Sequence, residues 1–324
     1  METPGRPTAE EIERLLVGTP ARYTRAEVAA KSGVSQELAE RIWRALGFAT
    51  LSDDAVAFSD ADVAALGRVR TMLDSGLLDE QTVLRMTRAL GRTTARLAQW
   101  QAEIMVGAML PKDTEASDSE LAAVLETAQN LLPDFEHVLV HVWRAQLAAA
   151  GTRMLALADT SDETETAKVN IAVGFADLVS FTRRARDLDE RQLAALVEGF
   201  EARAADVVAA HGARLVKTLG DEVLFSAPSA EVAARIALDL VEADELRIGL
   251  AYGPVLQMMG DVFGTTVNLA ARLTAIARPG TIVVDAGLAA ELAGQPGLDV
   301  LRIRRRPARG LGVVQPYVLR RSSS

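Results

Sequence analysis

The sequence predicts an α+β protein in two parts, an all-helical N-terminal half followed by a half that mixes helices with strands. In residues 1–158, apolar side chains recur at the spacing of amphipathic helices. From Val169 onwards, short β-rich runs alternate with helical patterns. Residues 159–167 are polar and acidic without apolar periodicity, and 324 residues are enough for two domains. We therefore expect a helical domain at 1–158, a linker at 159–167 and a second domain at 168–324.

The helical half carries capping residues where its periodic segments begin and end. Thr8 and Ser35 precede two segments and are expected as N-caps, and Gly47 follows one as a C-terminal stop. Pro133 is expected to break or kink the last helix, because proline removes a backbone hydrogen bond. The expected helices span residues 9–17, 24–31, 36–46, 60–73, 79–110 and 120–158.

The second half begins with a β-rich run at 169–175 and a long amphipathic helix at 188–210. Helices interspersed with strands that include close hairpins suggest an α+β sandwich, with helices packed on one sheet. The further expected strands span 213–218, 222–227, 246–253, 281–284, 298–304 and 313–320, and the further helices span 229–242, 266–277 and 286–293.

Composition excludes several classes of protein. With 49% apolar and 24% charged residues, the chain is not of the disordered class. No uncharged apolar run approaches about 18 residues, and no secretory signal is evident, so we expect a cytoplasmic protein without a membrane span. The absence of cysteine excludes disulfides, thiolate metal sites and a cysteine nucleophile. A formal net charge of −9 argues against non-specific binding of nucleic acid.

Two aspartates stand at expected strand ends. Asp177 closes the first apolar run, and Asp221 lies in the tight turn of the segment 217–221. Two carboxylates brought together repel each other unless a cation bridges them. Hard oxygen ligands without histidine or cysteine suit magnesium or manganese, usually bound together with substrate phosphates. Aspartate is also common in turns, so this pattern alone leaves a purely structural interpretation open.

A second polar pair lies on the helix expected at 266–277. Asn268 and Arg272 are four residues apart and therefore project from one face. An amide and a guanidinium one turn apart can bind a sugar oxygen and a phosphate together. A surface polar pair on an amphipathic helix would have the same spacing.

Three segments together resemble the motifs of class III nucleotidyl cyclases. These are FADLVSFT at 175–182, KTLGD at 217–221 and DVFGTTVNLAAR at 261–272, in the order and spacing of that family. The resemblance covers about 168–320. It implies a ferredoxin-like α/β sandwich that converts ATP to 3′,5′-cyclic AMP and pyrophosphate, by in-line attack of the ribose 3′-hydroxyl on the α-phosphate.

The resemblance also implies roles for residues around the first two segments. Asp177 and Asp221, with Leu178, would hold two divalent cations, Mg²⁺ or Mn²⁺. The backbone that continues to Phe181 and Thr182 would help to cradle the triphosphate, because free amides at a helix start favour anions.

The remaining implied roles concern the nucleoside. Lys217, one of only four lysines among 35 basic residues, would donate to adenine N1, and Asp261 would accept from the adenine amino group. The guanylyl cyclase pattern has glutamate and cysteine instead, and this chain has no cysteine. Asn268 would orient the ribose, and Arg272 would stabilise charge on the α-phosphate.

The family places the metal aspartates of one subunit opposite the purine-reading residues of another. A chain with both sets implies a head-to-tail homodimer with two equivalent composite sites. Ser180 departs from the glycine most often found there. The cation that would contact the triphosphate tail is not evident, since Gln315 stands near its expected place and Arg309 or Arg184 could substitute. The run 302–306 is interpreted as a solvated strand face.

The segment 40–48 resembles, more loosely, the helical regulatory domains of some actinobacterial soluble cyclases. This implies regulation by the N-terminal domain, through pH or a small-molecule or lipid effector. His137 and His141 are four residues apart, a spacing that can bind a metal or sense pH, but no third ligand is evident and ordinary packing or surface positions are favoured. His211 could contribute a pH response near the catalytic domain.

Two alternatives remain open. The segment 24–46 has the pattern of a helix-turn-helix, which would suit a DNA-binding regulator, although Glu37 and Glu40 disfavour contact with phosphates. The chain could also be a non-catalytic nucleotide-binding module. That alternative is weaker, because every catalytic position of the resemblance is filled.

Overall fold

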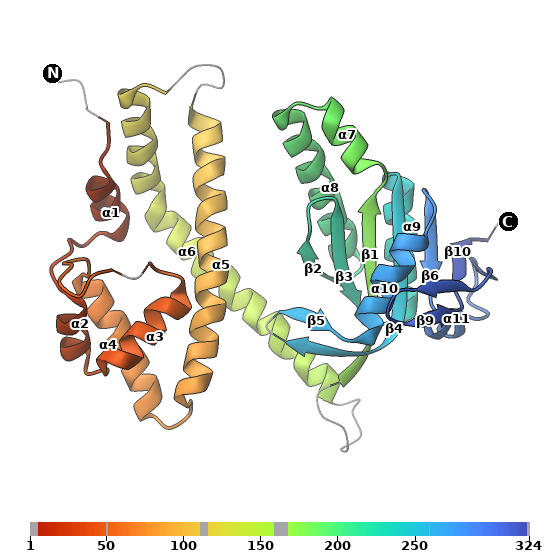
Figure 1. Cartoon of the computed structure of the whole chain (residues 1–324), viewed down its shortest axis with the longest axis horizontal. Helices are drawn as coiled ribbons and strands as arrows, with labels where there is room; N and C mark the ends of the chain where they lie inside the picture. Colours follow the sequence, from red (N-terminus) through yellow and green to blue (C-terminus); the bar gives the residue numbers. More distant parts are fainter. Residues whose placement is uncertain (1–5, 50, 111–115, 159–167, 259, 323–324) are drawn as a thin grey trace. The chain divides into compact units, whose positions relative to one another are not determined.

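The computed structural model describes residues 6–49, 51–110, 116–158, 168–258 and 260–322 (Figure 1). It divides into two compact units, Met1–Thr152 and Arg153–Ser324, which we describe separately. The first is helical, and the second combines a mixed sheet with helices, so the predicted α+β fold class is confirmed. The linker expected at 159–167 lies outside the described residues.

The N-terminal helices begin and end at the predicted caps. Thr8 forms a capping box with Glu11, the Ser35 side chain accepts from the amide of Leu38, and Gly47 ends its helix at φ 90°. The helices are α1 (Ala9–Val17), α2 (Arg25–Ser32), α3 (Gln36–Leu46), α4 (Asp60–Asp74), α5 (Glu80–Met109) and α6 (Asp118–Ala158).

A small core joins α2, α3, α4 and α5, with the rings of Trp43 and Phe58 stacked at 4.4 Å between centroids. Helices α2 and α3 form the predicted helix-turn-helix, but α3 also packs closely against α5. A Cβ added at Gly91 of α5 would lie 2.4 Å from the carbonyl oxygen of Leu46, and Arg41 of α3 pairs with Glu80. Because α5 covers part of α3, that helix is not presented as a free recognition helix.

Helix α6 continues through Pro133, so of the two effects expected of this proline, a break or a kink, the break is contradicted. A proline removes one hydrogen bond and costs about 3 kcal/mol, which the many remaining turns of a 41-residue helix outweigh. The carbonyl of Pro133 lies 2.7 Å from Nδ1 of His137 in the next turn. The helix begins at Asp118, two residues before its expected start at residue 120.

The C-terminal unit is built on an eight-stranded sheet in the order β2-β3-β1-β4-β6-β10-β7, with β5 paired to β4. The pairs are antiparallel except β4 with β6, and β8 and β9 form a separate hairpin. The strands are β1 (Lys168–Leu178), β2 (Arg214–Thr218), β3 (Glu222–Ala227), β4 (Leu246–Met258), β5 (Asp261–Phe263), β6 (Thr281–Val284), β7 (Leu298–Arg302), β8 (Arg306–Ala308), β9 (Gly312–Val314) and β10 (Tyr317–Arg321). The helices are α7 (Phe181–Asp187), α8 (Glu190–Ala210), α9 (Ala230–Ala243), α10 (Thr265–Ile276) and α11 (Ala286–Glu291).

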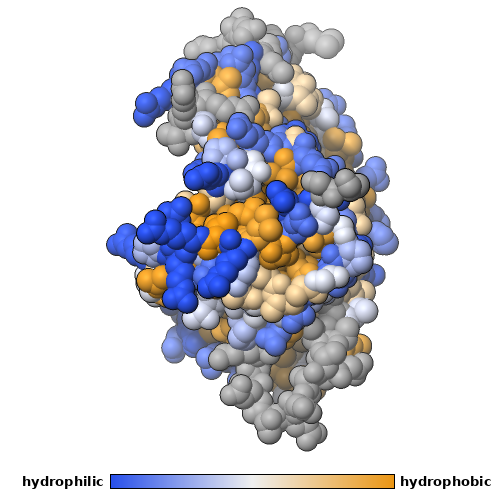
Figure 2. All heavy atoms as spheres, turned by 90° about the vertical axis from the view of Figure 1, so that its right-hand side faces the viewer, coloured by the Kyte–Doolittle hydropathy of each residue, from blue (hydrophilic) through white to orange (hydrophobic). Residues whose placement is uncertain are grey.

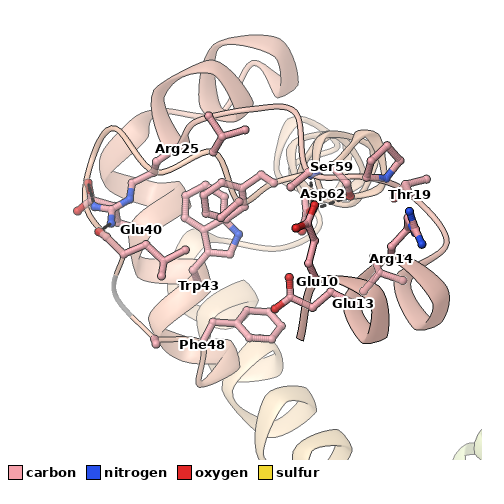
Figure 3. A pocket seen from close by; sticks show the side chains of 18 of the residues that line it. Glu10, Glu13, Arg14, Thr19, Arg25, Glu40, Trp43, Phe48, Ser59 and Asp62 are labelled. Carbon is pink, nitrogen blue, oxygen red and sulfur yellow. Dashed lines mark hydrogen bonds and ion pairs between the residues drawn. The ribbon is translucent and has the colours of Figure 1, made fainter. Parts of the chain in front are cut away.

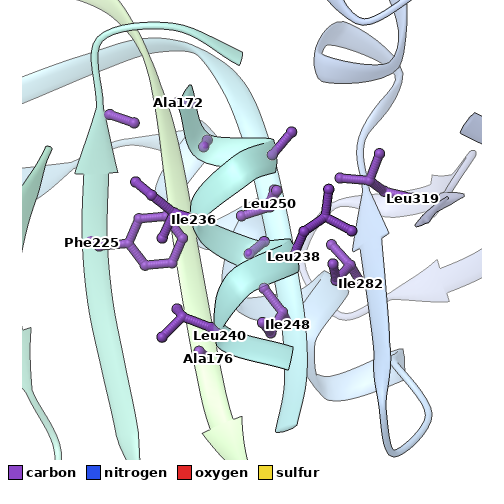
Figure 4. Packing of buried hydrophobic residues seen from close by; sticks show 14 of the residues in the cluster. Ala172, Ala176, Phe225, Ile236, Leu238, Leu240, Ile248, Leu250, Ile282 and Leu319 are labelled. Carbon is purple, nitrogen blue, oxygen red and sulfur yellow. The ribbon is translucent and has the colours of Figure 1, made fainter. Parts of the chain in front are cut away.

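Strand β1 lies inside the sheet and is buried on both faces. Its side chains alternate, so that Val173 and Phe175 join the cluster that includes α10, while Ala172 and Ala176 join the cluster that includes α8 and α9. Figure 4 shows the second cluster, in which side chains of α9 pack over the sheet beside the ring of Phe225.

Helix α10 approaches β4 at a glycine. A Cβ added at Gly249 would lie 2.2 Å from the amide nitrogen of Thr274 and 2.4 Å from the carbonyl oxygen of Ala270. The Thr274 hydroxyl donates to that same Ala270 carbonyl at 3.0 Å. The distance between α10 and the sheet therefore requires the absence of a side chain at this position.

Several elements of the C-terminal unit differ from the sequence-based expectation. Helix α7 and the short strands β5 and β8 were not predicted, and the helix expected from residue 188 begins at Glu190 with Asp189 as its cap. The strand expected at 313–320 is two strands, β9 and β10, which belong to different sheets. They separate at Gln315 and Pro316, because proline has no amide hydrogen for a strand ladder.

The arginine run at 302–306 is exposed at Arg302, Arg304, Arg305 and Arg306, in agreement with the predicted solvated face. Figure 2 looks onto the side of the C-terminal unit that carries α11 and β10, where hydrophilic side chains border an apolar area. Within the described part of the chain, no helix is both long and apolar enough to cross a bilayer.

We expect Gly249→Ala to lower the free energy of unfolding by about 1–3 kcal/mol, because the new methyl group overlaps the backbone of α10. Gly199→Ala in α8 is the matched control, since its Cβ would meet only the flexible end of Arg203, at 3.2 Å. Urea denaturation of both variants measures the difference. Equal midpoints would contradict the close contact.

Candidate active site

Three acidic residues lie at the C-terminal end of β1, namely Asp177 of β1 itself, Asp221 of the β2–β3 turn and Glu222 of β3. Asp177 is the penultimate residue of β1 and lies opposite Glu222 of β3 and Arg247 of β4 in the strand register. Residues paired directly across strands project from the same face of a sheet. The amide of Leu178 donates to the carbonyl of Asp221 at 2.9 Å, which holds the β2–β3 turn against the end of β1. The structure thus places Asp177, Leu178 and Asp221 next to one another.

The turn that carries Asp221 is tight and depends on a glycine. Gly220 has φ 77°, a conformation that favours glycine, and the amide of Leu219 donates to the carbonyl of Glu222 at 2.7 Å. Asp221 is therefore placed immediately before β3, next to the strand end that carries Asp177.

The acidic end has little positive charge to balance it. Burial raises the pKa of Asp177, the Arg247 guanidinium at 2.5 Å opposes this, and Asp221 raises it again. Burial, with Asp177 and Asp221 adding to it, raises the pKa of Glu222 to about 7. Such mutual repulsion favours the binding of a cation among these carboxylates.

Lys217 and Asp261 form an ion pair between β2 and β5, with Nζ and Oδ2 separated by 2.6 Å. Burial alone would raise the pKa of Asp261, but hydrogen bonds from Lys217 and from the Val262 amide, with the lysine charge, lower it. A hydrogen bond from Arg214 of β2 to the carbonyl of Gly260 holds the β4–β5 hairpin beside β2. The pair thus offers one ionised acceptor next to one cationic donor.

Asn268 and Arg272 lie on α10, four residues apart, and both are exposed. Among the described residues, neither side chain has a hydrogen-bond or ion-pair partner, so both remain available for a ligand. The close contact of α10 with Gly249 sets their position relative to the sheet.

The loop after β1 is strained at Ser180. This residue has φ 59° and ψ 24°, and it is the single non-glycine residue with positive φ in the described chain. A side chain in this region costs about 1–2 kcal/mol relative to glycine. Phe181 begins α7 and packs, partly buried, against the core, while the side chain of Thr182 lies outside what the structure describes.

Gln315 stands near the place expected for a cation that would contact the triphosphate tail, and the structure shows it bound to the backbone instead. Its side-chain amide donates to the carbonyls of Ile303 at 2.6 Å and Pro316 at 3.1 Å, so it is engaged with the backbone. Arg309 is exposed, and the side chain of Arg184 is not among those described.

Comparison with known proteins agrees with this arrangement. The family described as "Adenylate and Guanylate cyclase catalytic domain" matches residues 164–320, and "Adenylate cyclase regulatory domain" matches residues 7–150. An adenylate cyclase of Streptomyces coelicolor is 44% identical over 349 residues, which covers 97% of this chain and 90% of the relative. This chain belongs to the adenylate and guanylate cyclase family.

Two further proteins are similar to this cyclase. A pH-sensitive adenylate cyclase of Mycobacterium tuberculosis is 30% identical over 302 residues, covering 88% of this chain and 74% of the relative. The crystal structure of the adenylyl cyclase CyaB from P. aeruginosa has a TM-score of 0.45 and 18% identity, covering 49% of this chain and 98% of that chain.

Cyclases of this class use divalent metal ions. The donor types at the acidic end fit such ions, because the Asp177 and Asp221 carboxylates and the backbone oxygens beside them are hard ligands. Over the described ranges, no three histidine, aspartate or glutamate side chains converge on one point. Two carboxylates with backbone and substrate oxygens are therefore the donor set that this cyclase offers.

Glu222 and Arg247 at the acidic end are not among the residues predicted from the sequence. Glu222 directly follows Asp221, and Arg247 is the second residue of β4, but neither position belongs to the three matching segments. Only the strand register, which pairs both residues with Asp177, reveals them.

The regulatory domain contains a pocket of about 750 Å³ between α1, α3 and the loop before α4 (Figure 3). Trp43, Phe48 and Phe58 line it with aromatic surface, and charged side chains such as Arg14 and Glu10 also border it. The hydroxyl of Thr19, also in the lining, is buried without a hydrogen-bond partner in the described chain.

The three histidines differ in their surroundings. His137 and His141 are exposed on α6, and the described residues offer no third metal ligand beside them. His211 ends α8 and lies 2.7 Å from a carboxylate oxygen of Asp239.

Proposed function

We propose that this chain converts ATP to 3′,5′-cyclic AMP and pyrophosphate in its C-terminal unit. The observation that carries the proposal is the Lys217–Asp261 pair, which offers a donor and an ionised acceptor side by side at 2.6 Å. These groups match adenine N1, an acceptor, and the adenine amino group, a donor. Cyclic nucleotide production from ATP and from GTP, in the presence of Mg²⁺ or Mn²⁺, tests the proposal directly.

Asp177, Asp221 and the backbone at Leu178 would hold two divalent cations, Mg²⁺ or Mn²⁺. When bound, these ions would lower the pKa of the ribose 3′-hydroxyl and balance charge on the phosphates. The raised pKa values of Asp177 and Glu222 support the assignment, since they reflect burial first and then repulsion from neighbouring carboxylates, which a bound cation would relieve.

Asn268 would orient the ribose, and Arg272 would stabilise the negative charge that develops on the α-phosphate. Both side chains are exposed on one face of α10 and have no partner among the described residues, so they are free to bind a substrate. A preorganised donor of this kind contributes on the order of 100- to 1000-fold in rate.

The backbone from Leu178 to Phe181 and Thr182 would cradle the triphosphate. Arg247 is a candidate for contact with its tail, because its guanidinium already lies beside Asp177 at 2.5 Å. Metal binding at Asp177 would compete with that ion pair and release the guanidinium toward phosphate oxygens. Arg309 is the second candidate.

The two sets of residues would meet across a homodimer. Among the described residues, no hydrogen bond or ion pair joins the acidic end of β1 to Asn268 or Arg272. A head-to-tail dimer with two composite sites, each using the acidic end of one subunit and the α10 pair of the other, would complete both sets.

Residues 1–158 would form a regulatory domain connected to the catalytic domain, residues 168–324, by a linker at 159–167. The pH-sensitive relative supports a response to pH, with His211 as a candidate group in the catalytic unit. The pocket around Trp43 supports a small-molecule or lipid effector, since aromatic surface with a charged border fits an amphipathic ligand.

Lys217→Arg should lower kcat/KM for ATP by about 10- to 100-fold and reduce the preference for ATP over GTP. The planar guanidinium keeps the charge but cannot reproduce the reach of the ammonium group toward Asp261 and adenine. Lys31→Arg is the control, because Lys31 lies over the Tyr23 ring in the other unit. Steady-state assays with both nucleotides measure the ratio, and an unchanged ratio would contradict purine reading by Lys217.

Mixing two inactive variants tests the composite site. Asp177→Ala and Arg272→Ala should each lose about 100- to 1000-fold in rate. Co-refolded or co-expressed together, they should regain about a quarter of the normal activity, since half the dimers would contain one intact site. Differently tagged chains verify that mixed dimers form. No recovery from verified mixed dimers would exclude the head-to-tail arrangement.

A variant that lacks residues 1–160 should differ from the full chain in cyclase activity or in its pH profile, because the regulatory domain is removed. Assays of both proteins across pH, with ATP at saturation, measure the difference. Identical activity and identical profiles would contradict regulation by this domain.

A further inference from the structure

The end of the catalytic unit concentrates positive charge in a chain whose net charge is negative. Residues 301–324 contain seven arginines and no aspartate or glutamate, whereas the whole chain has a formal net charge of −9. Four of these arginines, Arg302, Arg304, Arg305 and Arg306, lie within one stretch of five residues, and all four are exposed. We call these four side chains the arginine patch.

Within the described chain, no carboxylate neutralises the arginine patch. None of its four guanidinium groups has an ion pair or a hydrogen bond to a described residue. The two arginines of β10 differ, because Arg320 pairs with Asp299 at 3.2 Å and Arg321 pairs with Asp239 at 2.7 Å. The patch is therefore a positive surface whose like charges repel one another until an anion approaches.

Protection of a sheet edge accounts for only one of these arginines. Strand β7 is last in the order of the main sheet, and a charged side chain on such a strand prevents pairing with another chain. Arg302 is the final residue of β7, whereas Arg304 and Arg305 follow the strand and Arg306 begins β8 of the separate hairpin. Three of the four charges thus lie outside the strand that forms the edge.

The β8–β9 hairpin adds an apolar surface beside the arginine patch. Pro307 of β8 lies directly opposite Val313 of β9, so both project from the same face of the hairpin. Pro307 is exposed, and Val313 is 68% exposed. The next residue, Ala308, points to the opposite face and is buried. The hairpin therefore packs on the unit with one face and presents an apolar outer face next to four cationic side chains.

We propose that the arginine patch and the outer face of this hairpin dock on the surface of a lipid bilayer that carries anionic headgroups. The guanidinium groups bind the lipid phosphates, because their planar set of donors matches phosphate oxygens. Pro307 and Val313 enter the boundary between headgroups and acyl chains, where apolar side chains flanked by cations are stabilised. The chain lies on the bilayer in this arrangement and does not span it.

An anionic bilayer fits this surface better than a nucleic acid does, although both carry phosphates. Proteins bind bases with polar side chains that reach base edges or with aromatic side chains that stack on them. The exposed neighbours of the arginines are aliphatic instead, with Leu301 44% exposed and Val313 68% exposed. Such side chains gain nothing against a phosphate backbone, whereas a bilayer removes their apolar surface from water.

Co-sedimentation with lipid vesicles tests this docking on the full-length chain. Vesicles of phosphatidylcholine alone are compared with vesicles that also contain phosphatidylglycerol, so that the surface is either neutral or anionic. The patch variant combines Arg304→Gln, Arg305→Gln and Arg306→Gln, and none of these positions belongs to the proposed catalytic residues. A second variant with lysine at the same three positions keeps the charge, and circular dichroism verifies that both variants fold.

Two control variants match the patch in charge and in apolar exposure. The first changes Arg85, Arg88 and Arg92 of α5 to glutamine, which removes the same charge from exposed positions of the other unit. The second pair compares Val313→Ser with Leu77→Ser, since Leu77 is an apolar side chain that is 86% exposed in the other unit.

We expect the full-length chain to bind the anionic vesicles and not the neutral ones, with binding weakened by added salt. The patch variant should bind about 100-fold more weakly, because each arginine near an anionic surface contributes about fivefold. The lysine variant and the α5 control should bind nearly as well as the unchanged chain. Val313→Ser should weaken binding several-fold, and Leu77→Ser should leave it unchanged.

Failure to bind anionic vesicles, equal loss in the patch variant and the α5 control, or unchanged binding by Val313→Ser would overturn the proposal. Fluorescence anisotropy with a labelled DNA duplex provides the remaining comparison. Tighter binding of the duplex than of the vesicles, through the same three arginines, would assign the patch to nucleic acid instead. These measurements require no cyclase activity, so their outcome is independent of the proposed function.

Discussion

The catalytic unit depends on the pairing of β1 on both sides. Antiparallel neighbours on each edge place Glu222 and Arg247 directly opposite Asp177, so three charged side chains meet at one strand end. The alternating burial of β1 leaves no freedom to change this register. A shift by one residue would turn Val173 and Phe175 toward the wrong cluster and would move Asp177 to the other face of the sheet. The positions of the acidic residues are therefore a consequence of core packing.

The remaining part of the site depends on small residues instead. Gly249 allows α10 to approach β4, and Gly174 leaves space for the ring of Phe225, whose Cζ would lie 2.3 Å from an added Cβ. A side chain at Gly249 would push α10 away from the sheet, and Asn268 and Arg272 would move with the helix. The site is thus built from a strand held by its neighbours and a helix held by a close backbone contact.

Many of the helices and strands could be predicted from the sequence, because the spacing of apolar residues and the capping residues are local signals. Residues such as Thr8, Ser35 and Gly47 act locally, and the structure confirms them. The motifs around Asp177 and Asp221 combine strand ends with a tight turn, and the structure brings them together. The features that the sequence did not predict depend on interactions between residues far apart in the chain.

Pro133 breaks no helix because the rest of α6 outweighs one lost hydrogen bond, and β5 forms only because the chain folds back on β4. Arg247 could not be identified from the sequence for the same reason. It contacts Asp177, which is 70 residues away in the chain, and only the pairing of β1 with β4 brings the two together. Local sequence patterns predict helix caps and turns, whereas the pairing of distant strands depends on the packing of the whole sheet.

The Lys217–Asp261 pair illustrates why a site need not contribute much to stability. Its side chains are 36% and 26% exposed, and an ion pair so accessible to solvent contributes about 0–1 kcal/mol to folding. The ion pair has a clearer effect on the ionisation and position of its two side chains. The pair lowers the pKa of Asp261, which keeps that carboxylate an acceptor, and it holds the ammonium group in one place before a ligand arrives. Ordering both side chains in advance removes an entropic cost that binding would otherwise incur. The ion pair therefore holds one donor and one acceptor side by side before a ligand arrives, as the proposed recognition of adenine requires.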